Sequence, residues 1–342
     1  MKTIKTLSTL FLLALSTTLA TAQNRKFCGT TEAEKLVFEQ HPELLKQSLE
    51  REAEYAKIDK QQAASNYASA RMQSVVYIIP VVFHIIHQNG VENISDAKVR
   101  EAIAVMNEDF RKGNPDSNVT IGLFKPLMAD CEIEFRLAEL DPSGNCTNGI
   151  DRVYSWETNN GGESAKFNQW TPSKYLNIWT VKKMSAAHLT AAAYSYTPGN
   201  APGGGDGIIS LYDYVGVNQY SRHTLSHEVG HYLNLRHTWG STNQPNVACG
   251  DDNVSDTPVT KGANGVCILT QSICNPPIVE NVQNFMDYSY CTTMFTPGQK
   301  TRMRNALTSS VAGRNNLWSR SEERRVGKEC GDECRSRWSP YH

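Results

Sequence analysis

The chain has 342 residues, of which 39% are hydrophobic and 20% are charged, and its formal net charge at pH 7 is −1. This near-neutral balance, without a basic stripe, argues against an electrostatic nucleic-acid binder, so we expect no nucleic-acid partner. The length allows one large domain or two modest ones with a well-formed core.

Residues 1–22 have the pattern of a secretory signal peptide. Lys2 and Lys5 precede an apolar run over 7–15, and a small-x-small cleavage pattern follows at 20–22. This run is too short for a membrane anchor, and no later stretch approaches the roughly 18 apolar residues of a spanning helix. We therefore expect a secreted protein, extracellular or periplasmic in transit, in which disulfides are permitted.

Residues 23–71 are polar and rich in helix formers, which indicates a helical or loosely ordered pro-segment. A simple N-terminal extension is the alternative. From Val75 the sequence becomes apolar and β-branched, which predicts a buried strand to about residue 87. Ser95 is a candidate N-cap for a helix over about 96–112.

Further strands are predicted over 133–140, 175–184 and 205–216, and another helix begins near Ser221. Strands and helices alternate, which favours an α/β fold. The part after residue 240 is rich in loops and contains four cysteines before the tail. No clear linker interrupts the chain over 72–319, which we interpret as one domain.

The last residues, 320–342, have no apolar periodicity and resemble the in-frame translation of a sequencing adapter. We interpret them as a non-native tail, with a charged natural tail as the alternative, and exclude them from functional reasoning. Of the nine cysteines, seven remain after Cys330 and Cys334 are set aside. Six of these lie beyond residue 130 and can pair in 15 ways, which leaves Cys28 as the odd one.

The chemistry is concentrated in the segment His227-Glu228-Val229-Gly230-His231, which has the form H-E-x-x-H. Residues four apart share one face of a helix, so both imidazoles can reach one metal ion. Glu228 beside them can take a proton from the attacking water. His237 can reach the same ion if the chain leaves the helix sharply, and Asn234 tolerates the left-handed backbone that this requires.

Composition alone predicts on the order of 0.01 occurrences of H-E-x-x-H in this chain, which makes an ordinary surface helix the weaker interpretation. Three histidines leave the fourth position of a zinc ion open to water, as in catalytic sites, whereas structural zinc sites are closed by four protein ligands. The pattern therefore predicts zinc-dependent hydrolysis of peptide bonds without a covalent intermediate. A secreted zinc-containing adhesin or binding module without catalysis is the alternative.

The long form of this motif resembles that of the metzincin clan, and residues 284–289 resemble its methionine-containing turn. With residues 294–303, the combination is similar to the smaller bacterial branch of the pappalysin family, over roughly 72–318. An astacin-like metzincin fits less well, because of the cysteine after the methionine turn and the Cys28-Gly29 pair. The resemblance implies a metalloendopeptidase that acts on proteins or peptides, and we expect a monomer.

For the fold, the resemblance implies an α/β (α+β) catalytic domain of the metzincin type. A twisted mixed five-stranded sheet with helices would lie above an active-site cleft, and an irregular, disulfide-bonded subdomain would lie below it. The strand near 207–214 would be the sheet edge that pairs with an extended substrate. Met286 would form the apolar floor of the zinc site, and Tyr288 would stabilise the oxyanion. In isolation, a core methionine and a core tyrosine would be the preferred interpretations.

The family also suggests two disulfides in the lower subdomain, Cys249–Cys274 and Cys267–Cys291. Cys131 and Cys146 flank a predicted turn, so a third pair is expected there, with two free buried thiols as the alternative. The segment 250–258 resembles a calcium loop of the family, in which Asp252, Asp256 and Thr257 would bind Ca²⁺. The alternative is an acidic surface turn.

Residues 25–30, Arg-Lys-Phe-Cys-Gly-Thr, resemble the cysteine-switch motif of latent family members. The thiolate of Cys28 would occupy the water's position on zinc, so that removal of the pro-segment would free the site. An unpaired or lipid-modified cysteine is the alternative. Arg71 is a candidate activation site.

The sequence departs from the family pattern in two places. Asn234 replaces the commoner glycine, which we expect to be tolerated. Only Tyr290 separates Ser289 from Cys291, where relatives that cut before Arg or Lys carry an acidic residue, so the basic specificity is not expected here.

Overall fold

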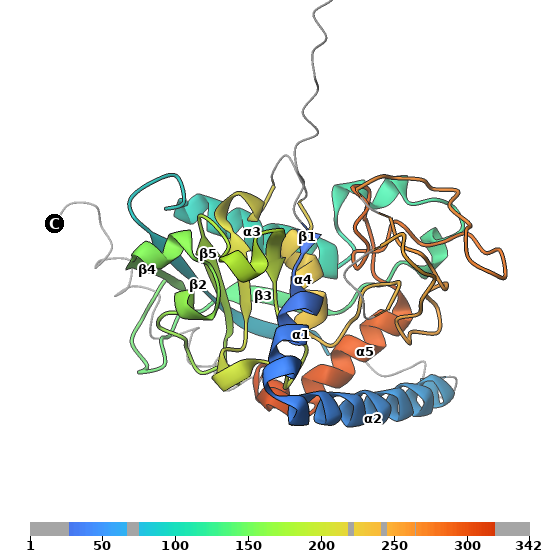
Figure 1. Cartoon of the computed structure of the whole chain (residues 1–342), viewed down its shortest axis with the longest axis horizontal. Helices are drawn as coiled ribbons and strands as arrows, with labels where there is room; N and C mark the ends of the chain where they lie inside the picture. The colour runs from blue at the N-terminus through green and yellow to red at the C-terminus, as the bar shows by residue number, and fades with distance from the viewer. Residues whose placement is uncertain (1–26, 67–74, 218–221, 241–244, 264, 319–342) are drawn as a thin grey trace, which may run out of the picture.

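The computed structural model describes residues 27–66, 75–217, 222–240, 245–263 and 265–318 (Figure 1). Several predicted features lie outside these residues, namely the signal peptide over 1–22, the start of the cysteine-switch motif at 25–26, the activation site at Arg71, the helix start at Ser221 and the tail over 320–342.

A mixed sheet forms the centre of the molecule, with the strand order β1-β6-β7-β5-β2-β3 and with β4 also paired to β2. Among the described pairs only β6 and β7 run antiparallel. The strands are β1 (Phe27–Cys28), β2 (Tyr77–His87), β3 (Ile133–Leu137), β4 (Ile150–Tyr154), β5 (Leu176–Val181), β6 (Ala191–Tyr194) and β7 (Ile208–Leu211).

The mixed sheet and the metzincin-type fold are as predicted, but the sheet has seven strands instead of five. One extra strand, β1, comes from the N-terminal segment, which pairs with β6. The long strand β2 also accommodates two partners along one edge, because β3 pairs with its first half and β4 with its second half.

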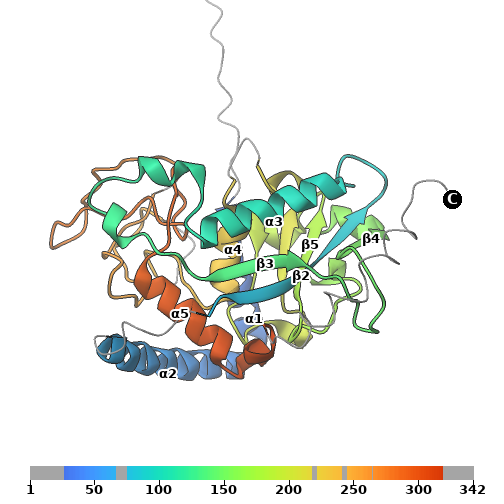
Figure 2. The same cartoon turned by 180° about the vertical axis from the view of Figure 1, so that it is seen from behind.

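The main core lies between the sheet and the helices. Alternate residues of β2 (Ile79, Val81, Phe83 and Ile85) are fully buried in it, as the two-residue period of a strand requires. Helix α3 (Asp96–Phe110) packs against β3 (Figure 2) and contributes Met106 and Phe110 to the same core. The helix begins as predicted at Ser95, whose hydroxyl accepts a hydrogen bond from the Lys98 amide.

Two further helices lie within residues 75–318, the part predicted to be the catalytic domain (the catalytic part). Helix α4 (Thr224–Tyr232) packs against α3, β6 and β7, and its residues Leu225 and Val229 are buried in the main core. Helix α5 (Pro297–Thr308) follows the loop-rich part and begins with a capping box made by Thr296 and Gln299. Short 3-10 helices form connections at Pro115–Val119, Lys125–Leu127, Trp156–Asn159, Glu163–Ala165, Ala186–His188, Pro202–Gly204, Tyr212–Tyr214 and Val311–Asn316.

The prediction that residues 207–214 form the edge strand was wrong. Strand β7 lies between β5 and β6, and β6 is the outer strand of the catalytic part. Strand β6 consists of Ala-Ala-Ala-Tyr, which lacks both alternation and β-branched residues, so the sequence provided no strand signal there. Its outer side pairs in parallel with β1.

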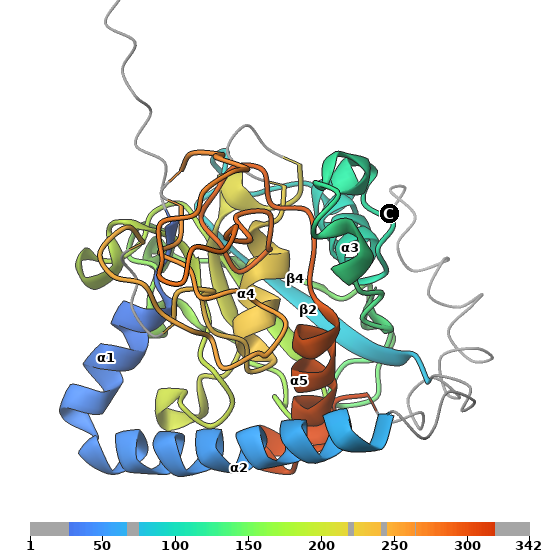
Figure 3. The same cartoon turned by 90° about the vertical axis from the view of Figure 1, so that its right-hand side faces the viewer.

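The N-terminal arm consists of β1 and the helices α1 (Thr30–Gln40) and α2 (Pro42–Asn66). Figure 3 shows the two helices as an L-shaped arm along one side of the molecule, with α2 running past α5. Ala33 and Val37 of α1 are buried against residues of β6, including Tyr194. The helical character predicted for this segment is therefore present in the described residues.

The lower region, residues 233–296, is irregular and contains the disulfides Cys249–Cys274 and Cys267–Cys291. The predicted pair Cys131–Cys146 was wrong. Cys131 is a free thiol that is fully buried in the main core, so it is not bonded to Cys146. Within the described residues, no helix is long and apolar enough to cross a membrane.

Candidate functional site

Helix α4 places two histidines of the H-E-x-x-H segment on one side. His227 and His231 are both buried, and each ring is oriented through its Nδ1 atom. The His227 Nδ1 donates to the backbone oxygen of Phe285 at 2.7 Å, and the His231 Nδ1 donates to that of Leu235 at 2.8 Å. With Nδ1 engaged in this way, Nε2 is the metal-ligating nitrogen of each ring, in the tautomer that such second partners typically fix.

The chain leaves α4 in a sharp turn that carries His237 back to the other two histidines. Asn234 has a φ of +74°, so it adopts the left-handed backbone that this turn was expected to need. The amide of Leu235 then donates to the Gly230 oxygen at 2.8 Å, which closes the helix end. As a result, His231 Nε2 lies 3.1 Å from His227 Nε2 and 3.2 Å from His237 Nε2.

Cys28 joins this group from the N-terminal arm. Its sulfur and one nitrogen of each histidine all lie within 4.8 Å of one another, and all four residues are buried. Zinc–nitrogen bonds of about 2.0–2.1 Å in a tetrahedron separate two ligand atoms by roughly 3.4 Å, close to the observed nitrogen separations. Burial also lowers the pKa of His231 well below its usual value, which favours the neutral, ligating imidazole. The four side chains therefore fit a zinc ion.

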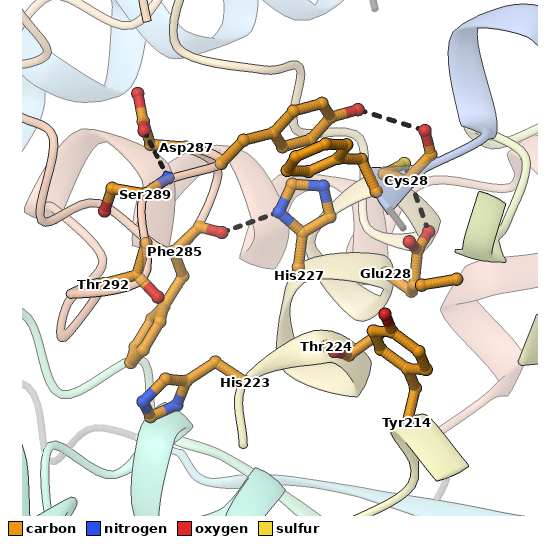
Figure 4. Close-up of a pocket in the computed structure, with 13 residues that line it drawn as sticks. Cys28, Tyr214, His223, Thr224, His227, Glu228, Phe285, Asp287, Ser289 and Thr292 are labelled. Carbon is orange, nitrogen blue, oxygen red and sulfur yellow. Dashed lines mark hydrogen bonds between the residues drawn. The ribbon is translucent and has the colours of Figure 1, made fainter. Parts of the chain in front are cut away.

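Glu228 lies beside the histidines and faces the N-terminal arm (Figure 4). Its Oε2 is 3.6 Å from the Cys28 sulfur and accepts a hydrogen bond from the Thr30 hydroxyl at 3.2 Å. The other oxygen, Oε1, is buried and has no hydrogen-bond partner among the described residues. Burial raises the pKa of this carboxyl to about 8, against the opposing effect of the bonds from Cys28 and Thr30. Such a carboxyl can exchange a proton near neutral pH.

The Cys28 thiol is held in two ways, by the place of Cys28 in β1 and by a backbone amide of the N-terminal arm. The Thr30 amide donates to its sulfur at 3.3 Å. Burial and the negative charge of Glu228 raise the pKa of the thiol. A cation among the three imidazoles would act in the opposite direction and favour the thiolate.

Met286 and Tyr288 belong to the turn below α4. The fully buried Met286 lies directly against the zinc-motif helix, because a Cβ atom on Gly230 would come within 2.4 Å of its sulfur. The Tyr288 hydroxyl donates to the backbone oxygen of Cys28 at 3.1 Å, and its ring stacks on Phe27 with centroids 5.0 Å apart. In this state the N-terminal arm holds the tyrosine that was predicted to stabilise the oxyanion.

A pocket opens next to this group (Figure 4). It lies between α4, strand β6 and the turn of Met286, and one end of it is closed by Phe27 and Cys28 of the N-terminal arm. Its lining includes His223, Thr224, His227, Glu228, Phe285, Ser289 and Thr292.

Comparison with known proteins gives a consistent result. A model of peptidase family M43, described as pregnancy-associated plasma protein-A, matches residues 159–308. Mature mirolysin of Tannerella forsythia, solved with a cleaved peptide, is 33% identical over 73% of this chain and 98% of its own, with a TM-score of 0.66. The chain belongs to this pappalysin family.

Other similar proteins extend the comparison to the N-terminal arm. A mutant of promirolysin, also from T. forsythia, is 30% identical over 87% of this chain and 99% of its own, with a TM-score of 0.72. An extracellular metalloprotease of Pyricularia oryzae is 27% identical over 89% of this chain and 97% of its own. One of Podospora anserina is 34% identical over 40% of this chain, which spans about half of that relative (48%). This pappalysin-family chain is accordingly a metallopeptidase.

The acidic segment of this family member, for which a calcium site was predicted, makes several hydrogen bonds through its carboxylates. Asp252 accepts hydrogen bonds from the Val254 amide and from the Thr257 hydroxyl. Asp256 instead accepts from the Thr296 hydroxyl at 2.6 Å and from the Gly298 amide at 2.8 Å, at the start of α5. The other oxygen of Asp252, Oδ2, is buried without a hydrogen-bond partner among the described residues, and the calcium site stays a prediction.

Several residues around the metal group were not predicted for this family member. His223, one turn before His227, is buried, and its ring nitrogens lie 2.9 Å from Asp109 and 2.8 Å from Asp116. The Ser195 hydroxyl donates to the Glu228 backbone oxygen at 2.9 Å. These partners lie far from α4 in the sequence, and no spacing rule connects them.

Proposed function

We propose that this protein is a secreted zinc endopeptidase that is made as a latent precursor. The observation that carries the proposal is the convergence of three histidine Nε2 atoms and the Cys28 sulfur beside the Glu228 carboxyl. His227, His231 and His237 would hold the zinc, and Cys28 would be its fourth ligand in the precursor. Peptides and proteins are the proposed substrates, in line with the cleaved peptide in the mirolysin structure.

Glu228 is the proposed general base. When bound, zinc lowers the pKa of water toward neutrality and polarises the carbonyl of the substrate. The Glu228 carboxylate accepts the proton of the attacking water and later donates it to the leaving amine. Tyr288, once released from the Cys28 backbone, would donate a hydrogen bond to the oxyanion.

Latency would arise from the N-terminal arm. Strand β1 pairs with the outer side of β6, and its backbone holds both Cys28 and the Tyr288 hydroxyl at the site. A substrate strand would need the same sheet edge. We propose that residues 23–71 are the pro-segment and residues 72–319 the catalytic domain. The similarity to promirolysin supports this division.

Location and assembly are further parts of the proposal. The curated relatives are named extracellular metalloproteases, which supports secretion, with the periplasm as a compartment of transit. We propose a monomer, which gel filtration with light scattering would test. A calcium ion at Asp252, Asp256 and Thr257 stays a prediction of the family resemblance. The adhesin alternative is disfavoured, because it gives no role to Glu228.

The experiment compares wild type and Glu228→Gln after removal of the pro-segment, with an unfolded protein as substrate. We expect the variant to keep its zinc and to lose activity by at least about 100-fold, as expected for a missing general base. Equal activity of the two proteins would refute the assignment. For latency, we expect the Cys28→Ala precursor to cleave the same substrate while the wild-type precursor does not. If neither precursor cleaves the substrate, the proposed role of Cys28 is refuted.

A further inference from the structure

The turn after α4 orients two of the three histidines. The Asn234 amide donates to the His231 backbone oxygen at 2.8 Å, and the next residue, Leu235, provides the backbone oxygen that accepts from the His231 ring. His237 follows two residues later. Any group that fixes the backbone at Asn234 therefore acts on both His231 and His237.

Arg302 of α5 is such a group. Its Nε donates to the Asn234 backbone oxygen at 2.7 Å, and the side chain is fully buried. Carbonyl groups at the end of a helix lack intrahelical partners and carry partial negative charge, so a cation stabilises them. The bond joins α5, which lies 68 residues further along the chain, to the turn that carries the zinc ligands.

A second buried arginine provides an internal comparison. Arg314 donates to the Tyr232 backbone oxygen at 3.2 Å, two residues before Asn234. Its charge is balanced within the catalytic part, because Asp206 accepts two hydrogen bonds from it at 2.5 and 3.0 Å. Both arginines hold the same helix end, but they differ in where their carboxylate partners come from.

Among the described residues, the carboxylates paired with Arg302 belong to α2 of the N-terminal arm. Glu52 binds the Arg302 guanidinium directly, and Asp59 lies 3.7 Å from it. Glu52 also lies 3.6 Å from Arg236, the residue immediately before His237. The arm thus contacts the turn after α4 at a second place, away from Cys28, through the ion pairs of Glu52 with Arg302 and Arg236.

We propose that Arg302 is a positioning residue for His231 and His237, and that Glu52 of the arm acts on the metal site through Arg302 in the precursor. This inference rests on the proposed zinc function. Cys28 would then block the fourth position, while Glu52 would fix the turn that supplies the third ligand. Arg302 would position His231 and His237 without touching the metal or the substrate.

The test measures zinc affinity of the full-length precursor by competition with a chromophoric chelator. We expect Arg302→Ala to raise the zinc dissociation constant about tenfold or more, the usual effect of losing a group that orients a ligand. Arg302→Lys should recover part of this, because an ammonium can still donate to the Asn234 oxygen. Glu52→Gln should cause a smaller rise than Arg302→Ala.

Two variants serve as matched controls. Arg304 lies on the same helix and binds Glu132 and the Val75 backbone instead of the zinc turn, so Arg304→Ala should leave zinc affinity unchanged. Glu54 is exposed on the same helix as Glu52, and Glu54→Gln should also have no effect. The visible spectrum of the cobalt-substituted protein should change in Arg302→Ala and remain unchanged in both controls, since it reports ligand geometry.

The outcomes distinguish a failure of this inference from a failure of the proposed zinc function. A wild-type precursor that binds no zinc would overturn both. If wild type binds zinc and a folded Arg302→Ala has an affinity within about twofold of it, only the positioning role fails. If Arg302→Ala does not fold, Arg302→Lys and Glu52→Gln decide, and unchanged affinity and cobalt spectra in both would overturn the inference.

Discussion

The upper and lower regions of the catalytic part are stabilised by different means. In residues 75–232, a sheet and two helices bury a continuous apolar core. In residues 233–296, loops are joined by two disulfides and by hydrogen bonds to buried carboxylates such as Glu280, which accepts from Thr260, Gln271 and three backbone amides.

The metal group lies where these regions meet. His227 and His231 come from the regular helix α4, whereas His237 and Met286 come from the irregular part. Helical geometry alone fixes the first two ligands relative to each other. The third ligand depends on how the lower region folds against the upper one, so perturbations of the two regions should have different consequences.

The largest effect on stability should come from the lower region. Cys249→Ala combined with Cys274→Ala removes a cross-link between residues 25 apart, which should lower the free energy of unfolding by about 3.5 kcal/mol. Denaturant unfolding would measure this loss. Cys131→Ala is the control, because it removes a buried thiol without removing a cross-link. A loss below about 1 kcal/mol in the double variant would mean that loop contacts already order this region.

The next effect concerns the charged group in front of α4. Burial by itself would lower the pKa of His223, but hydrogen bonds to Asp109 and Asp116 outweigh it and raise the pKa to about 9. Since the folded value exceeds the ordinary 6.5, the stabilisation is complete below pH 6.5 and is lost as the pH rises through 9. The loss should be about 3 kcal/mol.

Unfolding of the metal-free protein between pH 6 and 10 would test this expectation. Other buried carboxyls titrate in the same range, so the informative quantity is the difference between wild type and His223→Gln. That difference should shrink as the pH rises. A difference independent of pH would show that His223 is neutral in the folded protein.

A smaller effect is expected at the contact between the two regions. Gly230→Ala would push a methyl group into the Met286 sulfur, which should cost about 1 to 2 kcal/mol despite the better helix propensity of alanine. Thermal unfolding of Gly230→Ala, Met286→Ala and the double variant would measure the coupling. Met286→Ala should reduce the free energy of unfolding by less in the Gly230→Ala background than in wild type. Strictly additive losses would contradict the contact between the two residues.

The smallest effect is expected at the turn itself. Asn234 has a positive φ that glycine adopts freely, so Asn234→Gly should change the free energy of unfolding by less than about 1 kcal/mol. Asn234→Ala should cost more, about 1 kcal/mol or above, because a Cβ without a local hydrogen-bonding group disfavours this backbone. Equal unfolding energies for the two variants would show that the left-handed backbone is not what limits substitution here.

Local features of the site followed from the sequence. The four-residue spacing of His227 and His231, the helix between them and the turn at Asn234 depend on backbone geometry over a few residues. The buried strand β2 and the N-cap at Ser95 were predictable for the same reason. The disulfides Cys249–Cys274 and Cys267–Cys291 came from the family pattern and not from any local rule.

Only the tertiary structure decided which distant segments meet. The outer strand β6 has no strand pattern of its own and is defined by its partners β7 and β1. Cys131 is free because the start of β3 is covered by α3, which a turn between two cysteines does not reveal. Arg302 and Glu52 lie 68 and about 180 residues from Asn234 in the sequence. The same pattern of apolar residues is compatible with other arrangements of the helices, in which these side chains would not meet. Local backbone preferences determined how His227, His231 and Glu228 lie relative to one another on α4, whereas the burial of side chains between remote segments determined what holds them in place.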